Sequence, residues 1–242
     1  MTGGFVLVHG GMHGSWCWDR VIPLLRHPAV AIELPGRPGG DRVERPLCLA
    51  DYADAITEAA ERAGHDELIL VGHSMAGLSI PGAAQRLGDR LRHLVFVSAL
   101  VAREGALSVE MMPQPIRAWV KHRLRRMSAQ GRGFSLPEWV ARWYFCNDLS
   151  EADTRMVLGR LCPEPPEPML ERLPITSLSP EVPRTYLGYR QDHTIPVFAQ
   201  RRLARLVDAR LEHIDGGHDG MLSNASGTAS VLNRIATETF GG

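Results

Sequence analysis

The 242-residue chain has no excess of charge of either sign. Its 27 Lys and Arg residues balance 27 Asp and Glu residues, and Lys121 is the only lysine among the basic residues. Proteins that act mainly on nucleic acids or on anionic membrane surfaces usually need a strong positive excess. We therefore expect neither nucleic acid nor a membrane as a partner.

Cysteines are few and widely spaced. Cys17, Cys48, Cys146 and Cys162 form no C-x-x-C pair, which argues against a zinc framework and against a redox motif. No apolar run approaches the roughly 20 residues that a membrane-spanning helix needs. No basic leader precedes the first apolar run, Phe5–Val8. We therefore expect free thiols and a cytoplasmic protein. The oligomeric state stays open, a homodimer being one of the arrangements considered.

Short apolar runs bounded by Gly or Pro recur along the chain, and 44% of its residues are hydrophobic. Unbroken runs of this length are typical of strands that are buried on both faces of a parallel sheet. The predicted strands span residues Phe5–Val8, Val30–Leu34, Leu68–Val71, Leu94–Ser98, Thr185–Gly188 and Leu211–Ile214.

Amphipathic stretches separate these runs, and each has helical spacing. They are Trp16–Arg26, Leu49–Ala63, Met75–Leu87, Pro196–Val207 and Leu222–Phe240. Alternation of strands and helices indicates right-handed βαβ units. The predicted fold class is therefore α/β, with a mostly parallel sheet of about six strands and helices on both faces.

The alternation breaks between the fourth and fifth predicted strands. We expect a core formed by residues 1–100 and 183–242, and a helical cap formed by residues 101–182. The cap is rich in Trp and Met, and its apolar side chains, Trp119 and Trp143 among them, are candidates for lining a substrate pocket. The alternative for each of them is ordinary packing of the cap against the core.

Residues Ile116–Met127 of the cap have helical spacing, with Arg and Lys between the apolar positions. This pattern indicates an amphipathic helix with a solvated basic face. Binding of an anionic substrate or a membrane surface by that face is the alternative.

The most informative stretch joins an apolar strand, Leu68–Val71, to Gly72-His73-Ser74 and then to a helical pattern. A serine on a sharp turn between strand and helix exposes its hydroxyl above the sheet, with a helix N-terminus behind it. Gly-x-Ser alone is weak, because both residues are common. The strand before it and the helix after it make Ser74 a candidate nucleophile.

With this stretch the chain resembles the α/β-hydrolase family, and within it the small methylesterase and hydroxynitrile-lyase branch. The resemblance rests on three segments and covers nearly the whole sequence: Val6–Trp16, the turn around Ser74, and His218–Ser223. One position departs from the pattern. The fifth residue of the turn, usually glycine, is Ala76 here and is followed by Gly77.

A serine hydroxyl needs a base within hydrogen-bond reach and a third group that orients the base. The fold presents them in the order serine, acid, histidine. His218 follows a predicted strand and a Gly-Gly turn and is the candidate base, whereas His213 lies inside that strand.

The candidate acid is Asp192, which follows the fifth predicted strand. Asp215 and Asp219 are the alternatives, and each is better interpreted as a turn residue.

The oxyanion of a tetrahedral intermediate needs two backbone donors. The amide of Met75, directly after the nucleophile, is one candidate. By resemblance, the amide of Gly11 in the glycine-rich loop after the first strand is the other.

His9, His13 and His73 lack a carboxylate at ligand spacing, so we predict no metal site and interpret them as residues that fix the loop. There is also no Walker A motif and no dinucleotide-binding glycine motif, so no cofactor is expected.

Three reactions can be compared on this scaffold. Related hydroxynitrile lyases carry a polar residue after the first-strand histidine, and some carry a lysine after the catalytic histidine. This chain has Gly10, a candidate substrate-binding residue that cannot bind the cyanohydrin oxygen, and Asp219, which would repel cyanide. Ester hydrolysis is therefore favoured over cyanohydrin cleavage. Epoxide hydrolases and dehalogenases need a carboxylate where Ser74 stands.

The first hypothesis is therefore a serine carboxylesterase that hydrolyses a small or medium apolar or aromatic ester. The second is a tailoring enzyme of natural-product biosynthesis that uses the same three residues for methyl-ester or lactone cleavage, C–C cleavage or cyclisation. The third is a non-catalytic ligand receptor. Receptors on this fold commonly lose one of the three residues, and here all are present, which argues against it.

Overall fold

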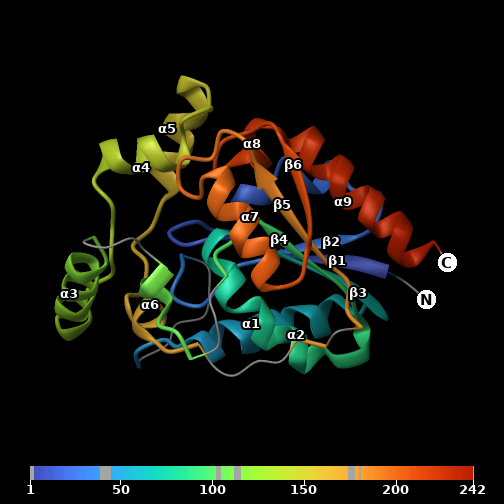
Figure 1. Ribbon diagram of the computed structural model, residues 1–242, viewed down its shortest axis with the longest axis horizontal. Helices are drawn as coiled ribbons and strands as arrows, with labels where there is room; N and C mark the ends of the chain where they lie inside the picture. The colour runs from blue at the N-terminus through green and yellow to red at the C-terminus, as the bar shows by residue number, and fades with distance from the viewer. Residues whose placement is uncertain are drawn as a thin grey trace.

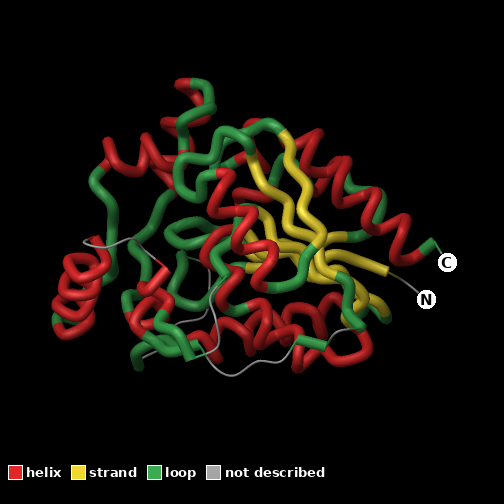
Figure 2. Tube along the Cα trace, viewed as in Figure 1, coloured by secondary structure: helices red, strands yellow, loops and turns green. Residues whose placement is uncertain are grey.

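A single six-stranded sheet forms the centre of the protein (Figures 1 and 2). The computed structural model describes residues 3–38, 45–101, 105–111, 116–173, 178–179 and 181–241. Every neighbouring pair of strands is parallel, in the order β2-β1-β3-β4-β5-β6. The strands are β1 (Gly3–Val8), β2 (Ala29–Ile32), β3 (Glu67–His73), β4 (Leu91–Val97), β5 (Arg184–Tyr189) and β6 (Arg210–Ile214). The predicted α/β class is confirmed, and each of the six predicted apolar runs overlaps one strand.

Helices cover both faces of the sheet. One face packs against α1 (Leu49–Ala63), α2 (Ile80–Leu87) and α7 (Val197–Leu206). The other face packs against α9 (Ala225–Phe240) and two short 3-10 helices, η1 (Ser15–Trp18) and η2 (Ile22–Leu24). Figure 1 shows α1 and α2 below the strands and α9 above them.

Alternate residues of each strand supply the two cores. In β1, Val6 and Val8 belong to the core under α1 and α2, whereas Phe5 and Leu7 belong to the core under α9. All four side chains are fully buried. Burying a large apolar side chain contributes about 1.5–3 kcal/mol, so strands that are apolar at every position are stabilised from both sides.

Three predicted helices differ from the structure. Trp16–Arg26 forms η1 and η2 instead of an α-helix, and Pro23 in η2 lacks the N–H that a continuous helix would need. Met75–Leu87 divides into η3 (Ser74–Leu78) and α2, with Pro81 in the first turn of α2. Leu222–Phe240 divides at Asn224, whose side chain caps α9 by accepting from the Gly227 amide. The short helix before this cap is α8 (Gly220–Ser223).

The segment between β4 and β5, called the cap segment below, is helical in its described part. It contains η5 (Ser108–Met111), α3 (Ile116–Ala129), α4 (Glu138–Phe145), α5 (Glu151–Arg160), α6 (Glu167–Leu170) and, near both of its ends, residues outside the described ranges. The limits 101–182 for a separate cap stay a prediction. Within the described ranges, no helix is both long and apolar enough to cross a membrane.

The cap segment lies over the carboxyl ends of the strands. β1 starts beside the N-terminus at the right of Figure 1, and the cap helices gather at the left, where the parallel strands end. In parallel α/β sheets, ligands bind outside the carboxyl ends of the strands. The space between this sheet edge and the cap segment is therefore where a site is expected.

Candidate active site

Ser74 occupies a strained turn between β3 and η3. Its φ of 52° places a non-glycine residue in the left-handed region, which costs of order 1–3 kcal/mol and is typical of functional turns. A side chain at Gly77 would stand 2.2 Å from the Leu100 carbonyl oxygen, so position 77 must be glycine. Ala76 fits at the fifth position of the turn with only 2% of its surface exposed. The departure at Ala76 is thus accommodated.

Three side chains predicted from the sequence meet at this turn. The Nε2 atom of His218 lies 2.9 Å from the Ser74 hydroxyl oxygen, and its Nδ1 atom lies 3.0 Å from Oδ2 of Asp192. His218 is fully buried, and Ser74 has 8% of its surface exposed. His218 comes from the loop after β6, and Asp192 from the loop after β5. This geometry allows one ring to take a proton from the serine while the carboxylate fixes the other nitrogen.

Both carboxylate oxygens of Asp192 accept hydrogen bonds. Oδ1 accepts the N–H groups of Thr194 (2.7 Å) and Ile195 (2.9 Å), and Oδ2 accepts the Ser98 hydroxyl (2.5 Å) as well as His218. Burial alone would raise the pKa of Asp192, but the His218 ring and these hydrogen bonds outweigh it, so that the pKa lies below its ordinary 3.8. Asp192 is therefore ionised near neutral pH.

His218 is also fixed by groups that do not react. The Nε2–H of His73 donates to the His218 carbonyl oxygen at 3.0 Å. Burial lowers the pKa of His73 well below 6.5, which keeps this histidine neutral beside the His218 ring. The ring of Phe145, at the end of α4, stacks on His218 with centroids 5.6 Å apart. The cap segment thus contributes directly to the orientation of the His218 ring.

Gly10 and Gly11 lie against Ser74 and Met75. A β-carbon on Gly10 would stand 2.7 Å from the Ser74 β-carbon, and one on Gly11 would stand 3.3 Å from the Met75 sulfur. The Gly11 N–H makes no hydrogen bond within the described part of the chain. Met75 lies in the first turn of η3, where backbone N–H groups lack a partner inside the helix. Two backbone donors are therefore available near the Ser74 hydroxyl.

Trp119 and Trp143, predicted to line a substrate pocket, lie mostly in solvent. Their exposed fractions are 61% and 60%, and the Trp143 ring packs against His193 at the surface. The structure does not bring either ring to Ser74, and their role in substrate binding stays a prediction. Phe145, two residues after Trp143, is 6% exposed and points inward instead.

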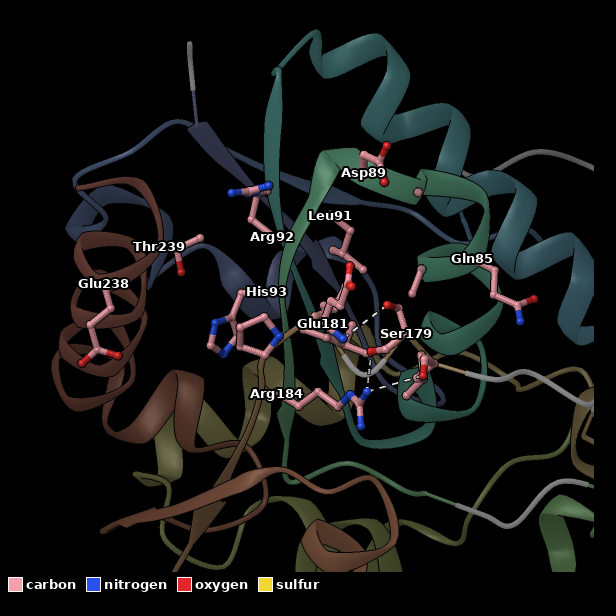
Figure 3. Close-up of a pocket in the computed structure, with 16 residues that line it drawn as sticks. Gln85, Asp89, Leu91, Arg92, His93, Ser179, Glu181, Arg184, Glu238 and Thr239 are labelled. Carbon is pink, nitrogen blue, oxygen red and sulfur yellow. Dashed lines mark hydrogen bonds between the residues drawn. The ribbon is translucent and has the colours of Figure 1, made fainter. Parts of the chain in front are cut away.

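A separate cavity of about 710 Å³ lies at the other end of the sheet, where β4 and β5 begin (Figure 3). It is lined by the first residues of β4 and β5 and by the end of α9, with Arg92, His93, Arg184 and Glu238 among them. His93 contacts the Thr185 hydroxyl at 3.0 Å, and burial lowers its pKa to about 4. This cavity is remote from the carboxyl ends of the strands and contains none of the predicted site residues.

Comparison with known proteins agrees with the fold. A family model described as the alpha/beta hydrolase family matches residues 5–231, and the chain therefore belongs to that family.

The relatives include several proteins named as esterases. The chain is 39% identical over 101 residues to esterase PIR7B of Oryza sativa subsp. japonica, a match that covers 39% of this chain and 38% of the rice protein. It is 29% identical over 220 residues to methylesterase 1 of Arabidopsis thaliana, with 81% of each chain covered. The matches to the rice esterases thus span less than half of those proteins, whereas the Arabidopsis match spans most of both chains.

Solved structures share the whole architecture. An extracellular alpha/beta-hydrolase from a Paenibacillus species superimposes with a TM-score of 0.85 at 23% identity, covering 96% of this chain and 98% of the other. The methylesterase MES16 from Arabidopsis superimposes with a TM-score of 0.76 at 22% identity, covering 97% and 98%. At these identities the likeness establishes the fold alone.

Proposed function

We propose that this protein is a serine carboxylesterase in which Ser74 is the nucleophile, His218 the general base and Asp192 the orienting acid. The observation that carries the proposal is the His218 ring, which lies 2.9 Å from the Ser74 hydroxyl oxygen and 3.0 Å from the Asp192 carboxylate. The names of the relatives, which include esterases and methylesterases, support the same reaction class.

The geometry supports a two-step reaction. His218 accepts the Ser74 proton as the hydroxyl oxygen attacks the ester carbonyl carbon, and the imidazolium then returns that proton to the departing alcohol. Water, deprotonated by the same ring, next attacks the acyl-serine and releases the acid. Asp192 holds Nδ1 protonated, so that Nε2 is free to accept the proton.

The amides of Gly11 and Met75 are the proposed oxyanion hole. Each lies on a backbone fixed before substrate arrives, and such preorganised donors stabilise charge without reorganisation. Removing one such donor typically costs about 10²-fold to 10³-fold in rate.

The surroundings favour an uncharged, apolar ester of small or medium size. Met75 directly follows Ser74, Phe145 stacks on the His218 ring, and Met12 belongs to the same apolar cluster as Phe145. Each of the three is less than a tenth exposed. Gly10 leaves no room for the polar side chain by which a hydroxynitrile lyase would bind a cyanohydrin, because any β-carbon there approaches Ser74. A cytoplasmic location and a homodimer stay predictions.

Hydrolysis of short aryl and methyl esters by purified protein tests the proposal. Ser74→Ala should abolish turnover, whereas the exposed Ser226→Ala should leave it unchanged. Undiminished turnover in Ser74→Ala would overturn the assignment. Inertness towards a broad ester panel, together with conversion of a polyketide-like ester or lactone, would favour the alternative, a natural-product tailoring reaction on the same residues.

A further inference from the structure

The loop His9–His13, called the oxyanion loop below, is held between two buried ion pairs. His13 pairs with Asp219 on one side, and Arg37 pairs with Glu164 of the cap segment on the other. All four residues are at most 4% exposed. Buried charge is costly to maintain unless it is paired and hydrogen-bonded. Two such pairs around one short loop indicate a role beyond packing.

His13 is doubly protonated in this arrangement. Its Nδ1 atom lies 2.8 Å from the Gly11 carbonyl oxygen, and its Nε2 atom lies 3.1 Å from Oδ2 of Asp219. Both partners are acceptors, so both ring nitrogens must donate, and the ring is an imidazolium. His9 differs, because its Nδ1–H donates to the Gly10 carbonyl oxygen while its Nε2 accepts the Leu34 N–H. His9 is therefore neutral.

The groups around His13 are consistent with a fixed positive charge. Trp16 stacks on the ring, and Phe145 and His73 approach it edge-on. Burial and the nearby Arg37 lower the pKa of His13, but Asp219 and the hydrogen bonds outweigh them, so that the pKa lies above 6.5. Asp219 directly follows the proposed base, and the pair therefore also connects the two loops.

Glu164 holds the other side of the loop. Its Oε2 atom accepts the Met12 N–H at 2.6 Å and a guanidinium N–H of Arg37, and its Oε1 atom accepts the Tyr52 hydroxyl at 3.2 Å. Two residues earlier, the Cys162 N–H donates to the Met12 carbonyl oxygen at 2.9 Å. Met12 itself has a φ of 60°, a conformation that a methionine rarely adopts without such restraint.

His13 and Glu164 act on one peptide group. The Gly11 carbonyl, bound by His13, and the Met12 N–H, bound by Glu164, belong to the same planar unit and point in opposite directions. Fixing the carbonyl and the N–H of the Gly11–Met12 peptide restricts the backbone of Gly11. The one group of Gly11 that is left for a ligand is its own N–H.

We propose that His13 and Glu164 are positioning residues of the oxyanion loop, which clamp the Gly11–Met12 peptide from opposite sides and thereby aim the Gly11 N–H at the reacting carbonyl. The proposal rests on the proposed esterase function for its catalytic consequence. The charge state of His13 and the hydrogen bond of Met12 do not depend on that function and can be measured separately.

The charge state is tested by nitrogen NMR on protein labelled with ¹⁵N-histidine. The His13 signals are identified as those that disappear in His13→Gln. At about pH 6.5, the ordinary histidine pKa, they should show protons on both ring nitrogens, and one of these protons should be lost only at a higher pH. Asp219→Asn should convert them to a neutral ring, whereas Asp215→Asn, at an exposed position in the same loop, should not. A His13 ring with a single proton in the wild type would overturn the proposal, whatever the enzyme's activity.

The positioning role of Glu164 is tested by Glu164→Gln, with Glu138→Gln as the exposed control in the same cap segment. The expected result is a fall in kcat of about 10-fold to 100-fold, below the effect of losing a donor outright, with KM within about twofold. Affinity for a boronic acid that mimics the tetrahedral intermediate should fall with kcat, while affinity for the product acid should not. Exchange of the Met12 amide with deuterium should accelerate.

If Glu164→Gln leaves both kcat and the rate of deuterium exchange at the Met12 amide unchanged, Glu164 is not a positioning residue. The same conclusion follows if kcat/KM falls only because KM rises. If Glu164→Gln does not fold, the double variant Arg37→Gln/Glu164→Gln leaves no unpaired buried charge and is judged by the same results. Absence of ester turnover in the wild type would refute the proposed function, and the histidine and amide measurements would still decide the clamp.

Discussion

Nε2 of His218 lies 2.9 Å from the hydroxyl oxygen of Ser74, although 144 residues separate them in the chain. The parallel sheet produces this approach, because β3 and β6 end at the same edge and their following loops meet there. The fold therefore brings together a serine, an acid and a histidine that lie far apart along the chain.

Asp192→Asn should lower kcat by about 10³-fold to 10⁴-fold without unfolding the protein. An amide at this position can donate to Nδ1 of His218, which stabilises the tautomer that cannot accept the Ser74 proton. Steady-state kinetics with a short aryl ester, alongside circular dichroism, measures the effect. A loss of less than tenfold would show that another group orients the base.

Ser98→Ala should have a smaller effect on rate and a measurable effect on stability. The Ser98 hydroxyl donates to the same Asp192 oxygen that faces His218, and a hydrogen bond to a charged group contributes about 1.5–3 kcal/mol. Urea unfolding should show a destabilisation of that size, and kcat should fall by about tenfold or less. Equal stability of Ser98→Ala and wild type would mean that the hydroxyl is not needed to compensate the buried charge.

Gly10→Ala should impair catalysis because the new methyl group would stand 2.7 Å from the Ser74 β-carbon. Either the oxyanion loop or the nucleophile must shift, and a displacement of about 1 Å can cost about 10²-fold in rate. Gly159→Ala is a matched control, because no atom lies within 4 Å of a β-carbon at that position of α5. The control should keep full activity and gain up to about 1 kcal/mol of stability. Full activity in Gly10→Ala would contradict the close packing of loop and nucleophile.

Stability should decline as the pH rises above neutrality, in a way that depends on Asp219. The pKa of His13 is raised above its ordinary 6.5 in the folded protein. The stabilisation from this shift is fully present below the unfolded value and is lost as the pH rises through the folded value. The free energy of unfolding, measured in urea from about pH 6 to about pH 9, should fall over this range. The decline should be weaker in Asp219→Asn, and an equal slope in both proteins would exclude His13 as its source.

The sheet was predictable from the sequence because β1, β3 and β4 each contain a run of four residues that is apolar at every position, which is typical of strands covered on both faces of a parallel sheet. Trp16–Arg26 was predicted wrongly as one helix, since helical spacing of apolar residues also fits two short 3-10 turns interrupted by Pro23. Which side of a cap helix faces inward was not predictable either. Trp143 and Phe145 are two residues apart on α4, about 200° around the helix axis, and only Phe145 faces inward.

The site was predictable where local motifs mark it and not where it depends on distant pairs. Ser74 and His218 lie in recognisable turns. Ser98, directly after β4, has no motif around it, and only the structure shows its hydrogen bond to Asp192. Asp219 was interpreted as a turn residue, yet its side chain is fully buried and pairs with His13, 206 residues away. No local pattern marks such a pair, because neither residue alters the sequence near the other.

Peptide mass spectrometry after treatment with a fluorophosphonate tests the central claim most directly. The reagent reacts with serines that a neighbouring base activates, and we predict a single adduct on Ser74. The adduct should be absent in Ser74→Ala and should form far more slowly in His218→Ala. A correctly folded wild-type protein that carries no adduct on Ser74 would contradict the proposed mechanism and favour a non-catalytic ligand receptor on this fold.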